Sequence, residues 1–234
     1  MAPVYKRILL KLSGEVLAGE SGKGIDFDTV KPICEVIKEC ADMGVQIGIV
    51  VGGGNFWRGR SSGTMDRSRA DQMGMLATVM NSLALQEALI QEGVDAVVMT
   101  ALDIQRVGRS FNKDEAVRLL EEGRVVIFGG GTGNPFFSTD TGASLRACEI
   151  EADIFFKASN VDGVYDKDPN KYADAVKYDT LTYDEILEKR LGVMDNTAAA
   201  LAGNSRLPIL VFNLNDPANI KKAVLGENIG TIVR

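Results

Sequence analysis

A lysine near the N-terminus stands where a strand is predicted to end. Lys11 lies in the apolar run "YKRILLKL" (residues 5–12) and is followed closely by Ser13 and Gly14. Because glycine lacks a Cβ, backbone N–H groups beside it can approach a phosphate, and a lysine ammonium suits a transferring phosphoryl group. The loop lacks the Lys-Ser/Thr pair of a Walker motif. It therefore indicates either a phosphate loop or a plain strand-ending turn.

Two glycine clusters each follow a predicted strand, in "VVGGGNFWRGR" (50–60) and "FGGGTGNPFFSTDTG" (128–142). The first adds Arg58 as a phosphate clamp. The second adds hydroxyl and amide groups and a helix predicted to open near Asp140, whose free N–H groups would form an anion site. Neither cluster contains the GxGxxG of a dinucleotide fold. Two such pockets predict two phosphate-bearing ligands that face each other, although each cluster could also be a turn.

A polar loop, "KASNVDGVYDKDP" (157–169), follows another predicted strand. Its three aspartates, Asp162, Asp166 and Asp168, do not have the spacing of a calcium-binding EF-hand loop. Tyr165 can offer a ring face to a nucleotide base. The alternative is a solvated surface turn.

Composition narrows the chemistry. The 234 residues include no histidine, which excludes Ser-His and Cys-His pairs and histidine metal sites. Phosphoryl transfer relies on positioning and charge neutralisation, so lysine, arginine and backbone amides can support it. A net charge of −6 disfavours general nucleic-acid or anionic-membrane binding. The three scattered cysteines predict free thiols, and the absence of a signal-like or membrane-spanning segment predicts a cytoplasmic protein.

The elements that position these groups alternate between strands and helices. Apolar runs predict strands at 5–12, 45–51, 94–100, 124–128, 152–159, 207–213 and 230–233. Helices are predicted at 28–44, 71–92, 112–123, from near residue 140, after a capping box at 182–185, and at 216–226; the face of the second that carries Leu76, Val79, Met80 and Leu83 is expected inward. This order predicts an α/β fold with a mostly parallel sheet covered on both faces, as one domain over residues 1–234, with two lobes that meet near residue 150.

Six ordered motifs resemble the bacterial UMP kinase family of the amino acid kinase superfamily. They are "KRILLKLSGE", "VVGGGNFWRG", "DQMGMLATVMN", "GTGNPFFSTD", "KASNVDGVYDKDP" and "VMDNTA", and the resemblance runs from Tyr5 to Arg234. It implies a three-layer αβα sandwich and transfer of the ATP γ-phosphoryl group to UMP, with Mg²⁺ carried by ATP, in pyrimidine nucleotide biosynthesis. It also implies a homohexamer of dimers, inhibition by UTP, and possible activation by GTP at "GESGKG" (19–24).

The resemblance also implies residue roles. Lys11 would stabilise the transferred phosphoryl group, and Asp140 and Asp195 would orient Lys11 or the metal, with no residue assigned as a metal ligand. The ATP site would comprise Lys11, Leu12, Ser13, Gly14, Gly54, Arg58, Ser159, Asn160, Tyr165 and Asp168, with Arg58 also counted as catalytic. The UMP site would comprise Gly53, Asp71 at the ribose, Thr132, Gly133, Asn134, Pro135, Phe136, Phe137, Ser138 and Thr139.

Two departures from many relatives, Ala70 and Ser159, are mild. Two other functions stay open. A carboxylate or carbamate kinase of the same superfamily would share Lys11 and the first glycine cluster, but should lack the 71–81 helix and the 132–139 pocket. A non-catalytic nucleotide sensor would have no need of Lys11, Arg58 and Asp140.

Overall fold

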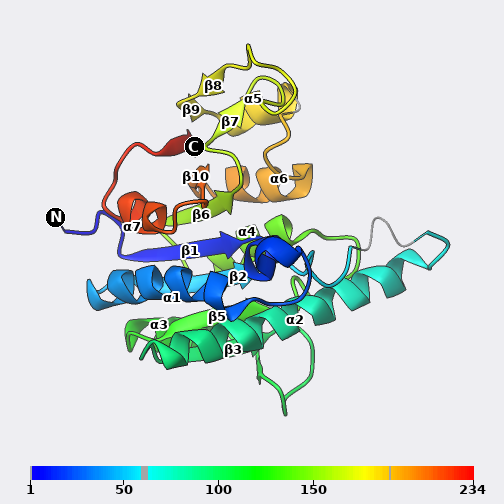
Figure 1. Ribbon diagram of the computed structural model, residues 1–234, viewed down its shortest axis with the longest axis vertical. Helices are drawn as coiled ribbons and strands as arrows, with labels where there is room; N and C mark the ends of the chain where they lie inside the picture. The colour runs from blue at the N-terminus through cyan, green and yellow to red at the C-terminus, as the bar shows by residue number, and fades with distance from the viewer. Residues whose placement is uncertain (1, 59–62, 190) are drawn as a thin grey trace.

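The fold centres on a nine-stranded, mostly parallel sheet, shown in the computed structural model of Figure 1. The structure describes residues 2–58, 63–189 and 191–234. The strand order is β4-β3-β5-β2-β1-β6-β10-β11-β9, and β10 and β11 form the antiparallel pair. The strands are β1 (Arg7–Leu12), β2 (Gln46–Val51), β3 (Ala96–Thr100), β4 (Arg109–Ser110), β5 (Val125–Gly129), β6 (Ile154–Ser159), β9 (Thr180–Leu181), β10 (Ile209–Asn213) and β11 (Gly230–Val233).

Helices cover both faces of this sheet, which makes three layers. One face carries α1 (Phe27–Asp42), α2 (Arg67–Gln91) and α7 (Ala218–Val224), and the other carries α3 (Lys113–Glu121), α4 (Thr139–Glu149), α5 (Tyr183–Glu188) and α6 (Asn196–Asn204). The predicted αβα sandwich with a mostly parallel sheet is therefore confirmed. A 3-10 segment, η1 (Gly14–Ser21), follows β1, and a separate hairpin pairs β7 (Val164–Tyr165) with β8 (Lys177–Tyr178).

Side-chain alternation along the central strands divides the core into two layers. In β1, Leu10 and Leu12 pack with the α1 side, whereas Leu9 packs with the α4 side. Successive residues of a strand point to opposite faces, so Lys11 has the same facing as Leu9. In β6, Phe155 packs with the α4 side and Phe156 with the α1 side, so Lys157 also faces α4. The strand pattern thus directs both lysines to one helix.

The long helix α2 differs from its prediction in two ways. It begins at Arg67 behind an Asp66 cap, four residues before the predicted start at Asp71. Leu76 and Met80, predicted inward, are 49% and 46% exposed, whereas Val79 is buried as predicted. Other buried residues of α2 include Met75, Thr78 and Leu85. The apolar residues of α2 are distributed all around the helix, so their periodicity could not predict which face is buried. Its length and composition would permit a membrane span, but α2 packs on α1, β3 and β5 as a core helix.

Candidate active site

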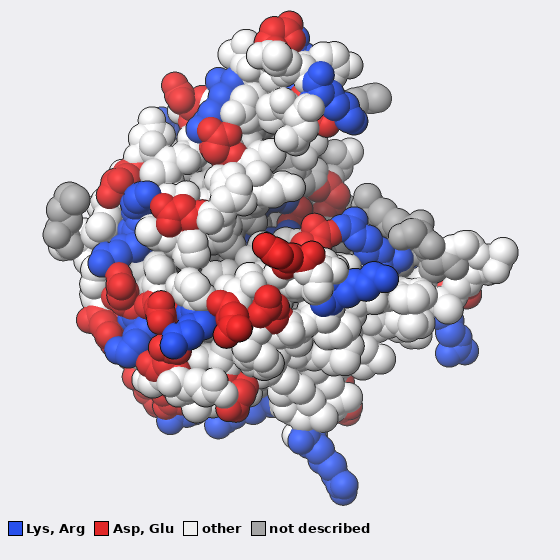
Figure 2. Space-filling view, viewed as in Figure 1, with Lys and Arg blue, Asp and Glu red and all other residues white. Residues whose placement is uncertain are grey.

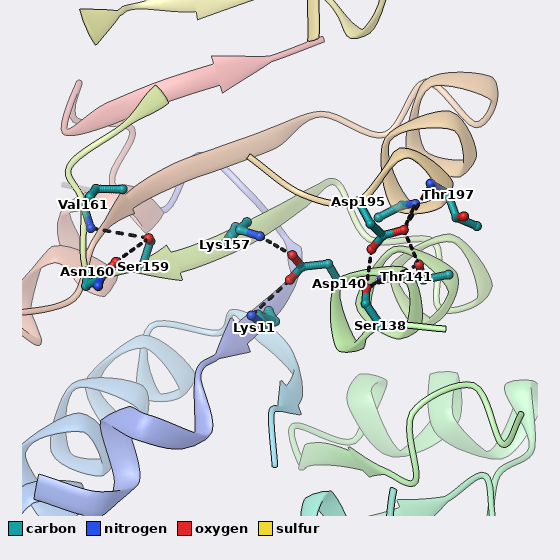
Figure 3. Close-up of polar contacts among 11 residues, drawn as sticks. Lys11, Ser138, Asp140, Thr141, Lys157, Ser159, Asn160, Val161, Asp195 and Thr197 are labelled. Atoms are coloured by element: carbon teal, nitrogen blue, oxygen red, sulfur yellow. Dashed lines mark hydrogen bonds and ion pairs between the residues drawn. The ribbon is translucent and has the colours of Figure 1, made fainter. Parts of the chain in front are cut away.

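Two lysines and one aspartate meet at the carboxyl ends of adjacent strands. Lys11 of β1 and Lys157 of β6 are register partners, and α4 places Asp140 in its first turn. The Nζ of Lys11 lies 3.0 Å from Oδ1 of Asp140, and the Nζ of Lys157 donates a hydrogen bond to Oδ2 of the same carboxylate. Figure 3 shows the two ammonium groups on either side of Asp140. In open parallel sheets this edge is where ligands bind.

Burial and charge act on this cluster in opposite directions. Burial alone would raise the pKa of Asp140, but the ammonium groups of Lys11 and Lys157 outweigh it and hold that pKa below its ordinary value. Burial lowers the pKa of Lys157, and Lys11 lowers it further, while Asp140 partly restores it. Asp140 is therefore ionised throughout the physiological range.

The first glycine cluster follows β2 and is pinned to α2. A Cβ on Gly53 would lie 2.8 Å from the Gly74 carbonyl oxygen and 2.9 Å from the Ala77 Cβ, so only glycine fits. Buried Asn55 and Asn81 exchange hydrogen bonds of 2.7 and 2.9 Å, and Asn81 also donates to the Gly52 carbonyl at 2.6 Å. Glycine is therefore needed at position 53 because the loop packs closely against α2, whether or not a ligand also approaches the loop.

Arg58 and Ser13 stand beside this cluster. Arg58 forms an ion pair with Glu15, and its side chain is 64% exposed. A Cβ on Gly54 would meet nothing closer than 3.8 Å, and the Arg58 side chain is one of the groups at that distance. Ser13 caps η1 by accepting a hydrogen bond from the Glu15 N–H. Gly59 and Arg60, which complete the sequence motif, lie outside the described residues.

A cavity of about 200 Å³ opens between the first glycine cluster, α2 and the loop after β5. Of the predicted UMP residues, it is lined by Gly53, Asp71, Thr132, Asn134, Phe137, Ser138 and Thr139. Trp57 and Thr78 also line it and were not predicted. In the described part of the chain, Gly133, Pro135 and Phe136 are outside this lining. The predicted residues are thus mostly brought together, with those three as the exceptions.

Asp71 joins α2 to the second glycine loop. Its Oδ2 accepts hydrogen bonds from the Phe136 N–H at 2.8 Å and from the Arg67 Nε at 2.7 Å. Phe136 has a positive φ of 73°, a conformation unusual for a side chain of its size, and it is 65% exposed. The Arg67 guanidinium carbon lies 5.6 Å from the centroid of its ring. Phe136 does not line the cavity, although the resemblance implied a place in the UMP site. The Gly130 N–H, in the same loop, donates to the Thr78 hydroxyl at 2.8 Å.

Asp195 connects the start of α6 to the second glycine loop and α4. It caps α6, accepting from the Thr197 and Ala198 N–H groups at 3.1 Å. It also accepts hydrogen bonds from the Ser138 and Thr141 hydroxyls, the latter at 3.0 Å (Figure 3). Within the described residues the carboxylate paired with Lys11 is that of Asp140, and the role of Asp195 in orienting Lys11 or the metal stays a prediction.

Lysines of the cluster line two further cavities. One, of about 700 Å³, is lined by Lys11, Ser13, Lys157, Ser159 and Asn160 among others. The second, of about 530 Å³, shares Lys157, Ser159 and Asn160 and adds Tyr165 and Asp168. Predicted ATP residues from the end of β1 and the residue before η1, Lys11 and Ser13, therefore converge with those of the 157–169 loop. Leu12 is buried, and of the predicted ATP residues in the described part of the chain, Leu12, Gly14, Gly54 and Arg58 are outside both linings. Gly54 lines the smaller cavity instead.

Lys157 is the functional candidate that sequence reasoning missed. It was read as part of an apolar strand, although a lysine inside "DIFFKAS" is conspicuous there. The available signal was its position: Lys157 is three residues after Ile154, as Lys11 is three residues after Ile8, and these residues are register partners in the sheet. Trp57 gave no signal beyond its place after the glycines. Its indole N–H donates to the Ala70 carbonyl at 2.8 Å.

A mostly parallel sheet covered by helices on both faces, with a lysine–aspartate cluster and cavities at its carboxyl edge, is the arrangement of a phosphoryl-transfer fold. The chain belongs to the amino acid kinase family, whose sequence model matches residues 6–213.

Three solved structures are similar to this chain over nearly its whole length. The chain is similar to the UMP kinase from Bacillus anthracis, with 37% identity and a TM-score of 0.95 over 98% of this chain and 96% of that one. It is 38% identical to the UMP kinase from Ureaplasma parvum, with a TM-score of 0.92 over 97% and 98% of the two chains. It is 32% identical to the uridylate kinase from Archaeoglobus fulgidus, with a TM-score of 0.75 over 97% and 99%.

Proposed function

We propose that the protein is a UMP kinase, which transfers the γ-phosphoryl group of ATP to UMP and releases UDP and ADP. The observation that carries this proposal is a lysine–aspartate cluster whose lysines line the larger cavity and whose Asp140 directly follows Ser138 and Thr139 in the lining of the smaller one. Similarity to UMP kinases at 32–38% identity over nearly the whole chain supports the choice of acceptor. Nothing favours a carboxylate kinase or a sensor over this reaction.

The chain's own groups fit this reaction. Lys11 would neutralise charge on the γ-phosphoryl group as its bond to the ADP oxygen breaks, and Arg58 would leave Glu15 to hold the ATP phosphates. A phosphate oxygen of UMP would form the new bond. That oxygen is already largely ionised near neutral pH, so the absence of histidine is no obstacle. Asp71 would bind the UMP ribose, and Tyr165 would lie against the adenine.

Mg²⁺ would arrive with ATP and neutralise phosphate charge when bound. The donor set fits such an ion, because magnesium takes one or two carboxylates and the substrate phosphates rather than a dedicated cage. Asp140 and Asp195 are the carboxylates near the cluster. No group of three acidic, histidine or cysteine side chains gathers around a common point in the described residues.

The remaining expectations are proposals that rest on the resemblance. We propose one domain over residues 1–234, supported by two core layers that share one sheet. We also propose a cytoplasmic homohexamer of dimers, with UTP as an inhibitor and GTP as a possible activator. General nucleic-acid binding is not proposed, since acidic and basic side chains intermingle on the face in Figure 2 and the net charge is −6.

The test is ADP release from Mg²⁺·ATP with UMP, CMP, dTMP, acetylglutamate and carbamate as acceptors. We expect turnover with UMP far above the other four. Turnover with a carboxylate would refute the assignment of the second cavity. A folded protein that binds UMP but releases no ADP would favour the sensor. Lys11→Met is the companion variant: it should abolish turnover while UMP binding persists.

A further inference from the structure

An arginine outside the smaller cavity holds a carboxylate that lines it. Arg67 is the first residue of α2, and Asp71 follows one turn later on the same side of the helix. The Nε of Arg67 donates a hydrogen bond of 2.7 Å to Oδ2 of Asp71. The Asp71 side chain is only 15% exposed and lines the cavity, whereas in the described part of the chain Arg67 is outside the lining. Arg67 therefore contacts the predicted ribose-binding carboxylate without lining the cavity.

The same arginine contacts the second glycine loop at Phe136. The Phe136 N–H donates to Oδ2 of Asp71 at 2.8 Å, and the Arg67 guanidinium carbon lies 5.6 Å from the Phe136 ring centroid. A φ of 73° is rarely populated by an aromatic residue, so its surroundings must hold Phe136 there. Asp71 holds its backbone and Arg67 its ring. Because the next residue, Phe137, lines the cavity, these contacts fix the loop where it meets the ligand site.

The contacts leave one oxygen of Asp71 available. Both donors, Arg67 and Phe136, bond to Oδ2. Among the described groups, Oδ1 has no hydrogen-bond partner. A carboxylate held at one oxygen by two donors cannot turn freely, so Oδ1 keeps one direction. A fixed acceptor of this kind suits a hydroxyl donor such as a ribose hydroxyl.

We propose that Arg67 is a positioning residue for the acceptor nucleotide, which fixes Asp71 and Phe136 so that the smaller cavity is formed before UMP binds. This inference rests on the proposed kinase function. Without Arg67, the Asp71 carboxylate could turn and the loop would lose one of its two contacts at Phe136. UMP binding would then have to order both, and such ordering lowers affinity. The lysine–aspartate cluster and the ATP side would be unchanged.

The test compares Arg67→Met with Arg67→Lys. In Arg67→Met the KM for UMP should rise about fivefold, the loss expected when one or two side chains must be ordered on binding. The kcat and the KM for ATP should stay within about twofold, because the phosphoryl-transfer groups are not touched. Arg67→Lys keeps a cation and a donor, so its KM for UMP should return to within about twofold of the wild type. The Arg67 side chain is 47% exposed, so the unfolding midpoint in urea should not change.

A double-mutant cycle separates positioning from direct contact between Arg67 and UMP. In Asp71→Ala there is no carboxylate for Arg67 to hold. Adding Arg67→Met to Asp71→Ala should therefore change the KM for UMP by less than about twofold. Losses that multiply would overturn the inference, since Arg67 would then act on UMP independently of Asp71.

The matched control is Arg69→Met, which removes the same charge from the same turn of α2. Among the described residues, Arg69 contributes its backbone N–H to the Asp66 cap, and its side chain forms no hydrogen bond or ion pair. Its KM for UMP should match the wild type. An equal rise in Arg69→Met would overturn the inference, because charge alone would explain the effect. An unchanged KM for UMP in Arg67→Met, or a loss confined to kcat, would also overturn it. A wild-type protein without UMP turnover would instead refute the proposed function, and the inference with it.

Discussion

Asp140 is the residue on which the candidate site depends most, because it is the single buried counter-charge of two lysines. Asp140→Asn removes that charge and leaves both ammonium groups without a carboxylate. Breaking a buried pair from one side typically costs about 3–5 kcal/mol. We therefore expect Asp140→Asn to lower the free energy of unfolding at pH 7 by about 3 kcal/mol, measured by urea denaturation.

The same variant should change the acid dependence of stability. The pKa of Asp140 is lowered in the folded state from an ordinary value of 3.8. A lowered carboxyl pKa means that the unfolded chain takes up the proton first, so this stabilisation is complete above about pH 4 and is lost as pH falls through the folded-state value. Between pH 4 and pH 2 the stability of Asp140→Asn should fall less steeply than that of the wild type. Parallel curves would contradict this prediction.

Asp71 carries the second residue-scale prediction. Its carboxylate already accepts the Phe136 N–H, and an asparagine Oδ1 can still accept that bond. Asp71→Asn should therefore keep the loop in place but lose the charged hydrogen bond to the ribose. That bond is worth about 1.5–3 kcal/mol, so the Kd for UMP should rise by about 10- to 100-fold.

Titration calorimetry with UMP and with ATP shows whether Asp71→Asn weakens UMP binding alone or disturbs the whole site. ATP binding by Asp71→Asn should stay within about twofold of the wild type. Asp66→Asn is the matched control, since Asp66 caps α2 through the Arg69 N–H and asparagine caps equally well. Equal losses of UMP and ATP binding in Asp71→Asn would remove Asp71 from the UMP site.

At the scale of elements, the sequence predicted the sheet better than the helices. All seven predicted strands form, because β-branched apolar runs bounded by glycine define buried parallel strands. The two-residue strands β4, β7, β8 and β9 are too short to show any periodicity. Helix α6, "NTAAALAGN", was missed because its small residues make no clear stripe.

The candidate site was partly predictable for a related reason. Carboxyl ends of parallel strands meet at one edge, so Lys11, both glycine clusters and the 157–169 loop had to converge. Which side chains touch was not predictable. The pairing of Lys157 with Asp140, and of Asp195 with Ser138, depends on how α4 and α6 sit on the sheet.

The junction between the first glycine cluster and α2 gives an element-scale prediction. Gly53→Ala would place a Cβ within 2.9 Å of α2 backbone and side-chain atoms, so the helix or the loop must shift. Overpacking of this kind costs about 1–3 kcal/mol. In a chain of this size the melting temperature should fall by roughly 2–12 °C, measured by differential scanning calorimetry.

Gly54→Ala is the matched control, because the new Cβ would meet nothing closer than 3.8 Å. Its melting temperature should stay within about 2 °C of the wild type. A similar fall in both variants would mean that the cluster needs glycine for backbone conformation rather than for its contact with α2.

At the scale of the whole molecule, the outward side of α2 exposes large apolar side chains that no other part of the described chain covers. Met73, Leu76, Met80 and Ile90 are 40–50% exposed and recur at helical spacing along one strip. Large apolar strips on a surface mark contacts with other proteins more often than chance exposure. The strip therefore supports the proposed assembly from dimers, with α2 at a subunit contact.

Leu76→Glu places a charge in the middle of this strip. A buried unpaired carboxylate would oppose association, because it would lose its hydration without gaining a partner. In light scattering after size exclusion we expect the wild type to be oligomeric and Leu76→Glu to shift to smaller species. Val176→Glu, at an apolar residue 61% exposed but remote from α2, should leave the oligomer intact. A Leu76→Glu protein of unchanged mass would place the subunit contact elsewhere on the molecule, whereas a monomeric wild type would refute the proposed hexamer itself.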